Sequence, residues 1–402
     1  MKPIIRFRQY NKEWCPFKLN TILVPSNEKN TKGLYSKNDV LSVSGEAGIV
    51  NQIAFQGRSF AGASVLNYGV VNTNDIVYTK SPLRNNPYGI IKTNNGPSGI
   101  VSTLYAIYNC CEESCPQFVD TYFTSSSRTN NYLRPLVRKG AKNDMKVSSE
   151  GALQGNVIFP YKDEQIEIAS YFRTLDAKLQ ASAKKVDSLK KLKSASLVAM
   201  FPQQGKTTPK VRFKGFEGEW IIKSFKELYK RSSIKNDLTY DSSKIISVAN
   251  MYFKEDNMNT DEAYLLTYNV MKLGDIAFEG NKSKSFAHGR FVENSIGNGI
   301  VSHVFVVFSP LNEDYDINFW KYYINNEQVM GSKLVRCTKS STMMTDLVVD
   351  DFLKETILVP SLEEQQEVGR YFATLDRKIA LETARLEKLK QIKRACLDKM
   401  FV

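Results

Sequence analysis

The side chains that could perform covalent or metal chemistry are few in this sequence. Its six cysteines include the cluster Cys110-Cys111-x-x-x-Cys115, a grouping that could suggest a metal site. However, the chain contains no CxxC pair, and its two histidines, His288 and His303, are far from the cluster in sequence. We therefore interpret the cysteines as plain reduced thiols and expect no metal site.

Two short fragments resemble catalytic motifs, but each lacks a required residue. Gly205-Lys206-Thr207 looks like the end of a phosphate-binding loop, yet Met200 stands where that loop needs a glycine. Asn86-Pro87-Tyr88 lacks the second proline of an amino-methyltransferase motif, and no glycine-rich loop for S-adenosylmethionine stands out. We also find no convincing nuclease arrangement of paired carboxylates with a lysine. The sequence therefore predicts that this chain alone is not an enzyme.

Polar and basic loops are the more promising feature. Lysine and arginine number 55 against 42 acidic residues, which gives a net charge of +13 and favours a polyanionic partner. Arg, Lys, Asn and Ser can donate hydrogen bonds to phosphates and to base edges, although ordinary surface loops have the same composition. The candidate DNA-binding residues in such segments are Lys80, Ser81, Arg84, Asn85, Arg128, Arg138, Lys139, Lys142, Asn281, Lys282, Lys284, Arg336, Lys339, Ser340 and Ser341.

The elements that position these residues occur twice. Residues 3–14 match residues 209–220, with Pro, Arg, Phe, Glu and Trp at one spacing. Residues 160–201 match residues 360–401 without a gap. The chain is therefore two copies of a unit of about 200 residues. The tails of the two copies stayed alike while the parts between them diverged, as expected if the tails share one partner and the variable parts face different targets.

The two matched tails are predicted to be long helices. Their apolar residues recur at alternating spacings of three and four, which is typical of a coiled-coil seam. Each helix of about 40 residues would be about 60 Å long. We expect the two helices to pair antiparallel around a pseudo-twofold axis and to form a rigid rod with a globular domain near each end. Their lysine-rich polar faces are either solvated or in contact with DNA phosphates or a partner subunit.

The parts between the tails mix short β-rich runs with turns, so we predict an α+β fold. Asp75-Ile76 matches Asp275-Ile276, and Gly99 to Ser102 matches Gly299 to Ser302. We predict strands around these matches, including one from Ile100 to Tyr108, a helix from Asp316 to Asn326, and a loop from Ser125 to Asn131. No apolar run is long enough for a signal peptide or a membrane span, so we expect a cytoplasmic location.

The arrangement closely resembles the specificity subunit of type I restriction–modification systems. The resemblance rests on Pro160-x-x-x-Glu164-Gln165 followed by Thr174-Leu175-Asp176, and on Pro360-x-x-x-Glu364-Gln365 followed by Thr374-Leu375-Asp376. The resemblance spans essentially the whole chain. The pattern Pro-x-x-x-Glu-Gln at the N-terminus of a helix is a recurring motif of that family.

The resemblance implies two target recognition domains, residues 1–158 and 204–358, and two spacer helices, residues 159–203 and 359–402. Each recognition domain would read one half of a split double-stranded DNA site. The helices would hold the readers about one DNA turn apart and would dock two modification (methyltransferase) subunits and two restriction subunits. The candidate spacer and docking residues are Gln165, Phe172, Leu175, Leu179, Gln365, Phe372, Leu375 and Ile379.

The resemblance also implies that this chain holds no cofactor of its own. S-adenosylmethionine, ATP and Mg²⁺ would belong to the partner subunits. Two alternatives stay open at this point: a duplicated DNA-binding regulator that works without an enzyme, and a coiled-coil scaffold unrelated to DNA.

Overall fold

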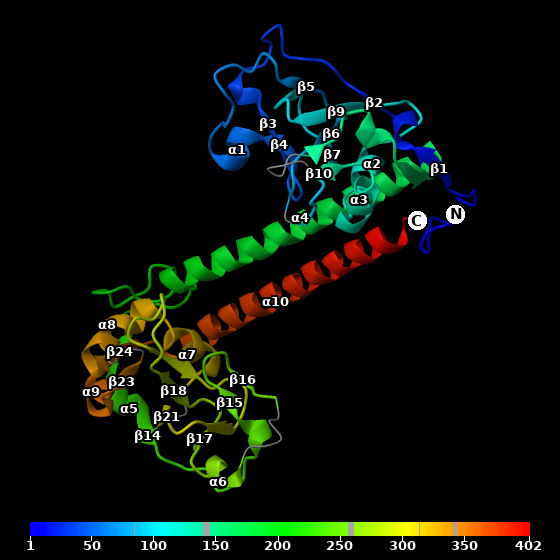
Figure 1. Ribbon diagram of the computed structural model, residues 1–402. Helices are drawn as coiled ribbons and strands as arrows, with labels where there is room; N and C mark the ends of the chain where they lie inside the picture. Colours follow the sequence, from blue (N-terminus) through cyan, green and yellow to red (C-terminus); the bar gives the residue numbers. More distant parts are fainter. Residues whose placement is uncertain (84, 140–144, 256–260, 313, 341–343) are drawn as a thin grey trace. The chain divides into compact units, whose positions relative to one another are not determined.

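The structure is a computed structural model that describes residues 1–83, 85–139, 145–255, 261–312, 314–340 and 344–402 (Figure 1). Its residues form two compact units. Unit 1 comprises Met1–Ser182 and Arg385–Val402, and unit 2 comprises Ala183–Ala384. The two long helices, α4 (Lys162–Ala199) and α10 (Leu362–Lys399), each contribute residues to both units.

Unit 1 is built on a four-stranded antiparallel sheet in the order β2-β9-β6-β7. Strand β6 is central, and its residues Ile76 to Thr79 are all buried because both faces of the sheet are covered. Ile76 and Tyr78 face the main core, whereas Val77 packs with Leu41 and Ile107 on the opposite face. The strands of this sheet are β2 (Leu23–Pro25), β6 (Ile76–Thr79), β7 (Ile91–Thr93) and β9 (Tyr105–Cys110).

Four two-stranded ladders and several short helices complete unit 1. The ladders are β1 (Cys15–Lys18) with β12 (Asn156–Phe159), β3 (Leu41–Ser44) with β4 (Gly48–Asn51), β5 (Gly69–Val71) with β8 (Gly99–Val101), and β10 (Arg138–Lys139) with β11 (Met145–Lys146). The helices are η1 (Leu19–Thr21), η2 (Lys37–Asp39), α1 (Gln52–Gln56), α2 (Pro116–Tyr122), α3 (Ser126–Leu133) and η4 (Gly151–Leu153).

Unit 2 contains a four-stranded antiparallel sheet in the order β14-β21-β18-β19. Matched by their place in the chain, these strands have the same order as the sheet of unit 1. Its strands are β14 (Tyr229–Ser232), β18 (Ile276–Glu279), β19 (Arg290–Glu293) and β21 (Val306–Pro310).

The other elements of unit 2 also include four two-stranded ladders. These are β13 (Ile221–Ser224) with β24 (Thr356–Val359), β15 (Ile246–Ser247) with β16 (Tyr252–Phe253), β17 (Asn269–Met271) with β20 (Gly299–Val301), and β22 (Thr338–Ser340) with β23 (Thr345–Leu347). The helices are α5 (Phe225–Leu228), η5 (Ser242–Lys244), α6 (Glu262–Leu265), α7 (Ile317–Tyr323), α8 (Glu327–Cys337) and α9 (Val349–Lys354).

Aromatic side chains form the core of each unit, and the end of a long helix closes it. In unit 1, Phe401 lies 5.6 Å from Phe118 and 6.3 Å from Trp14 between ring centroids. In unit 2, Phe201 lies 5.0 Å from Tyr323. Each helix therefore begins in one core and ends in the other, because α4 precedes Phe201 and α10 precedes Phe401.

Within each unit, the two long helices run antiparallel. In unit 1, Tyr171 of α4 contacts Cys396 of α10, with 3.4 Å between the hydroxyl and the thiol. In unit 2, Ser196 of α4 and Tyr371 of α10 are hydrogen-bonded at 2.9 Å. None of the helices in the described ranges combines the length and the apolar run needed to cross a bilayer.

Two of the repeated dipeptides form the same turn in both units. The carboxylate of Asp75 accepts a hydrogen bond of 2.7 Å from the backbone N–H of Asn72, and Asp275 accepts one of 2.7 Å from Lys272. The residue before the aspartate has a positive φ in each turn, 73° at Asn74 and 86° at Gly274. The buried aspartate thus stabilises the turn that leads into a central strand of each sheet, which explains why Asp-Ile recurs at the start of β6 and β18.

The structure corrects two predictions of local structure. Ser125 to Asn131 is not a loop, because Ser125 caps helix α3 by accepting a hydrogen bond from the N–H of Arg128. The predicted strand from Ile100 to Tyr108 is divided into β8 and β9, since the chain turns between them, where the N–H of Tyr105 donates to the carbonyl of Ser102. The helix predicted after Asp316 is confirmed as α7, capped by the Asp316 side chain.

Candidate nucleic-acid interface

Five of the candidate residues of unit 2 lie in adjoining exposed segments. The loop between β18 and β19 packs against the β22–β23 hairpin, where the N–H of Thr345 donates to the carbonyl of Gly280 at 2.8 Å. The amine of Lys282 donates to the Ser340 hydroxyl at 2.6 Å. We call this the unit 2 loop cluster, residues 280–286 and 338–340. It contains the candidates Asn281, Lys282, Lys284, Lys339 and Ser340, all of them exposed.

A side chain on Gly280 would disrupt this cluster. A Cβ there would lie 2.2 Å from the carbonyl oxygen of Thr345, which belongs to backbone and cannot move aside cheaply. The glycine therefore permits the loop and the hairpin to approach each other closely enough to share a ladder contact, the bridge between Asn281 and Met344.

The β6–β7 loop of unit 1 is anchored by helix α3 and by Ser149. The carbonyl of Asn85 accepts from the side chain of Asn130 at 3.0 Å, and the side chain of Asn86 accepts from Ser126 at 3.0 Å. The amine of Lys80 is 3.5 Å from the hydroxyl of Ser149, and burial lowers the pKa of Lys80. Of the candidates here, Asn85 is exposed, whereas Lys80 and Ser81 are half-buried.

Arg128 occupies an internal position in unit 1. Its guanidinium donates to the carbonyls of Tyr122 at 2.7 Å and Leu397 at 2.9 Å, and it stacks 4.5 Å from the ring centroid of Phe401. Burial lowers the pKa of Arg128. These contacts tie α3 to the end of α10, so the side chain serves the packing of unit 1.

The remaining basic candidates differ in their surroundings. Arg336 lies on α8 rather than in a loop, and its guanidinium binds the carboxylate of Glu355, with 2.7 Å between Nε and Oε1. Arg138 is exposed in β10, where Lys139 follows it. Arg84, Lys142 and Ser341 lie outside the described residues.

The candidate residues of the long helices are mostly buried within the units. Gln165 accepts hydrogen bonds from the Ser114 hydroxyl at 3.1 Å and the Cys115 N–H at 2.9 Å, and its amide donates to the carbonyl of Pro160 at 2.9 Å. Phe172 and Leu175 are buried beside it in α4, while Leu179 is half-buried. These side chains hold the helix to the globular part of unit 1.

Helix α10 is held in the same way in unit 2. The amide of Gln365 donates to the carbonyl of Pro360 at 3.2 Å, and its oxygen accepts from the indole N–H of Trp320 at 3.1 Å. Phe372 and Leu375 are buried, and Ile379 is half-buried. The recurring Pro-x-x-x-Glu-Gln pattern therefore fixes the start of each helix to its own unit.

The glutamates of the same pattern bind arginines that precede each globular part. The guanidinium of Arg6 donates to both oxygens of Glu164 at 2.7 Å, and Arg212 donates to both oxygens of Glu364 at 2.7 Å. The glutamate side chains are only 2% exposed. Sequence reasoning did not pair these residues, although all four belong to repeated segments, and recurrence at matched positions was the available signal.

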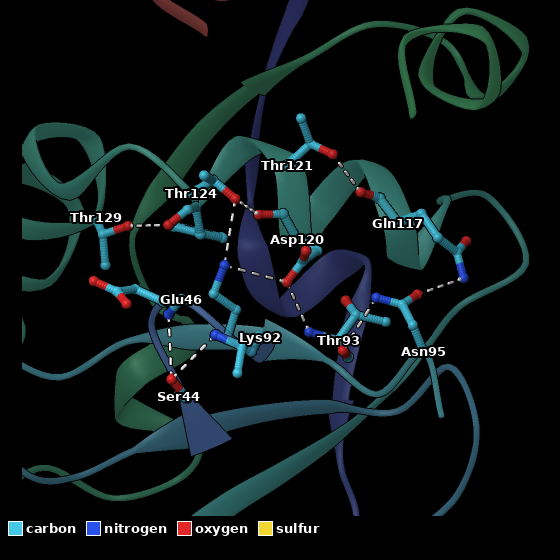
Figure 2. A network of polar contacts seen from close by, with 12 residues as sticks. Ser44, Glu46, Lys92, Thr93, Asn95, Gln117, Asp120, Thr121, Thr124 and Thr129 are labelled. Atoms are coloured by element: carbon cyan, nitrogen blue, oxygen red, sulfur yellow. Dashed lines mark hydrogen bonds and ion pairs between the residues drawn. The ribbon is translucent and has the colours of Figure 1, made fainter. Parts of the chain in front are cut away.

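A further polar network joins β7 to α2 in unit 1 (Figure 2). Lys92 is buried, with its amine 3.7 Å from the carboxylate of Asp120 and 3.4 Å from the Thr124 hydroxyl. Asp120 also accepts from the N–H of Thr93 at 3.0 Å. The matched strand and helix of unit 2 carry Val292 and Lys321 in place of this pair, so the interiors of the two units have diverged.

Comparison with known families favours one of the open interpretations. Residues 204–391 match the family described as the type I restriction modification DNA specificity domain. Residues 204–391, nearly half of the chain, are thus similar to a type I DNA specificity domain. The description of that family names DNA specificity, which agrees with the resemblance found in the sequence. No curated protein matches the chain significantly.

Solved structures with a similar fold include three from type I systems. The S subunit of a type I restriction-modification system from M. genitalium is 13% identical, with a TM-score of 0.56, and the match covers 100% of this chain and 99% of that one. The HsdS subunit from Thermoanaerobacter tengcongensis is 14% identical, with a TM-score of 0.47 and 98% of each chain covered. A chain from a study of complex assembly and conformational transition of the type I R-M system is 13% identical, with a TM-score of 0.48, over 97% of this chain and 98% of that one. We base the fold assignment on the first.

In the described ranges, no group of three or more His, Cys, Asp or Glu side chains could hold a metal ion. The candidate interface is a set of hydrogen-bond donors and cations, the side chains that contact phosphates and base edges of nucleic acids.

Proposed function

We propose that this chain is the DNA specificity subunit of a type I restriction–modification system, that it reads a split double-stranded DNA site, one half with each unit, and that it has no catalytic centre. The observation that carries the proposal is the shared construction of the two units. Both have the same sheet order, and both are joined to a long helix by a buried Arg–Glu pair and a glutamine. With the repeated sequence, this supports a duplicated recognition domain and a pseudo-twofold arrangement.

In this proposal the unit 2 loop cluster and the β6–β7 loop of unit 1 contact DNA. Their lysines would neutralise phosphates, and their asparagine and serine side chains would contact phosphates or base edges. Because the loops of the two units differ in sequence, each unit would select a different half-site. Arg84, Lys142 and Ser341 remain candidates on the sequence alone.

The long helices would act as an antiparallel coiled-coil spacer and as the docking surface for two modification subunits. Exposed apolar residues on both helices support a protein partner. Leu192 on α4 is 47% exposed, and its counterpart 200 residues later, Ile392 on α10, is 36% exposed. The same apolar position is thus presented twice, as two identical partners require.

The partner subunits would supply the chemistry. Modification subunits would bring S-adenosylmethionine and methylate adenine, and two restriction subunits would add ATP- and Mg²⁺-dependent translocation and cleavage. This activity places the complex in the cytoplasm, where the chromosomal DNA of the host lies.

Co-purification with the modification subunit of the same system tests the docking. Leu192→Glu combined with Ile392→Glu should abolish the complex, because each change places a charge in the apolar contact. Leu311→Glu is the matched control, since Leu311 is 45% exposed in unit 2 and belongs to neither long helix. Unchanged complex formation by the double variant would contradict docking on this face.

A further inference from the structure

A short exposed segment of unit 1 combines an arginine with aromatic side chains. It comprises helix α1 and residues 57–60 (Figure 1). Phe55 is 51% exposed and Phe60 is 57% exposed. The guanidinium of Arg58 lies over the ring of Phe60, 4.6 Å from its centroid. Exposing aromatic rings to water is unfavourable in free energy. Their grouping with an arginine therefore indicates a surface that binds a ligand or partner.

Gln52 holds this segment in one conformation. Its side-chain oxygen accepts a hydrogen bond of 2.7 Å from the N–H of Phe60, and its amide donates to the Ser42 hydroxyl on β3 at 3.3 Å. Gly57 ends α1 with a φ of 78°, and its N–H donates to the carbonyl of Ile53 at 2.8 Å. The arginine and the ring are therefore presented from a tethered turn, which lowers the conformational entropy lost on binding.

The charge of Arg58 is not neutralised within the chain as far as the described residues extend. Other arginines are satisfied internally, such as Arg6 by Glu164 and Arg212 by Glu364. Arg58 instead has a ring beneath its plane, which orients the guanidinium and leaves the N–H groups of its edge available. Two N–H groups on one edge of an oriented guanidinium can donate to the two acceptors that guanine presents in the major groove, O6 and N7.

The segment also distinguishes the two units. It lies between β4 and β5 of unit 1. The corresponding stretch of unit 2, residues 254–268 between β16 and β17, contains no arginine. A contact made to DNA of any sequence would be expected in both copies, whereas a base-reading contact belongs to one half-site.

We propose that Arg58 reads a guanine in the half-site bound by unit 1, and that Phe60 is a positioning residue that holds the guanidinium for this contact. This inference rests on the proposed function. It adds to the recognition surface a segment that lies outside the β6–β7 loop.

The test uses the full chain in complex with its modification subunit, on the target found by methylation mapping. Duplexes with each base pair of the unit 1 half-site replaced in turn are titrated with wild-type, Arg58→Ala, Arg58→Lys and Phe60→Leu complexes. Arg8→Ala is the matched control, because Arg8 is an exposed arginine of unit 1 outside the segment. Co-purification with the modification subunit verifies that every variant is folded.

We expect both Arg58 variants to lose about tenfold or more of the discrimination at one G·C pair, with the unit 2 half-site unchanged. Arg58→Lys is decisive, since it keeps the charge but not the planar edge. Phe60→Leu should lose part of the same discrimination, and Arg8→Ala should lose none. Discrimination equal to wild type at every position, or an affinity loss equal for all sequences, would overturn the inference. A wild-type complex without any sequence preference would instead refute the proposed function.

Discussion

At the scale of single residues, the side chains that recur in both halves have structural roles that the printed sequence does not reveal. Glu164 and Glu364 are recognisable as a family mark, yet their partners Arg6 and Arg212 are 158 and 152 residues distant. Local patterns cannot pair residues over such separations. The recurring Gly99 and Gly299 are explained by close packing, since a Cβ at Gly299 would lie 2.4 Å from the carbonyl oxygen of Lys244.

The buried pair of unit 2 gives a prediction of stability. Glu364→Gln should lower the free energy of unfolding of unit 2 by about 3 kcal/mol, because it leaves the Arg212 charge without its buried counter-charge. Glu367→Gln, one turn later on α10, is the control: Glu367 is 42% exposed and pairs with exposed Arg370, so its loss should cost less than about 1 kcal/mol. Denaturant unfolding of both variants measures the difference, and equal effects would contradict the assignment.

Glu293 gives a prediction of pH dependence. Burial raises the pKa of Glu293 well above its usual range, and the hydroxyl of Tyr315 and the charge of Lys321 only partly offset this. A raised folded-state pKa means that the carboxyl's contribution to stability is present below the ordinary glutamate pKa and is lost as the pH rises. Wild-type protein should therefore become progressively less stable than Glu293→Gln between pH 5 and pH 8.

Thermal unfolding at several pH values checks this, with Glu367→Gln as an exposed control. A stability difference between wild type and Glu293→Gln that stays constant across the range would show that the group does not titrate between the two states.

At the scale of elements, the sequence predicted those helices whose apolar residues recur at a regular local spacing. The apolar seam predicted two long helices, and the matched prolines predicted where they begin. Helix α3 was missed because the polar run Ser125–Asn131 resembles a loop, and burial of Tyr132 and Leu133 against distant segments decides its structure. The proximity of the β18–β19 loop to the β22–β23 hairpin was likewise not predictable, since it depends on pairing between residues about 65 positions apart.

Helix pairing gives a prediction at this scale. Asp376 of α10 binds the amine of Lys193 on α4 and accepts a hydrogen bond of 2.6 Å from Tyr322 on α7, so it joins three helices of unit 2. A double-mutant cycle of Lys193→Ala and Asp376→Ala should give a coupling of about 1 kcal/mol, reduced by partial exposure. The repeated pair in unit 1, Lys393 with Asp176, should give a similar value. Additive effects at both sites would contradict a role in helix pairing.

At the scale of the whole molecule, the proposed function implies that the length of the two long helices sets the length of the unread gap between the half-sites. The units divide between Ser182 and Ala183 and between Ala384 and Arg385, so seven residues inserted at both points leave the contacts within each unit intact. A heptad adds about 10 Å of helix, or about three base pairs of DNA. The unread gap should lengthen by that amount with both half-sites unchanged, as read by methylation mapping. A change in the half-site bases would contradict this role of the helices.

Split-site recognition by this chain is tested most directly by single-molecule sequencing of methylated DNA from cells that carry this chain and its modification subunit. We expect a split, asymmetric motif with a fixed gap and one methylated adenine on each strand. An assembled complex that methylates no split motif would contradict this expectation.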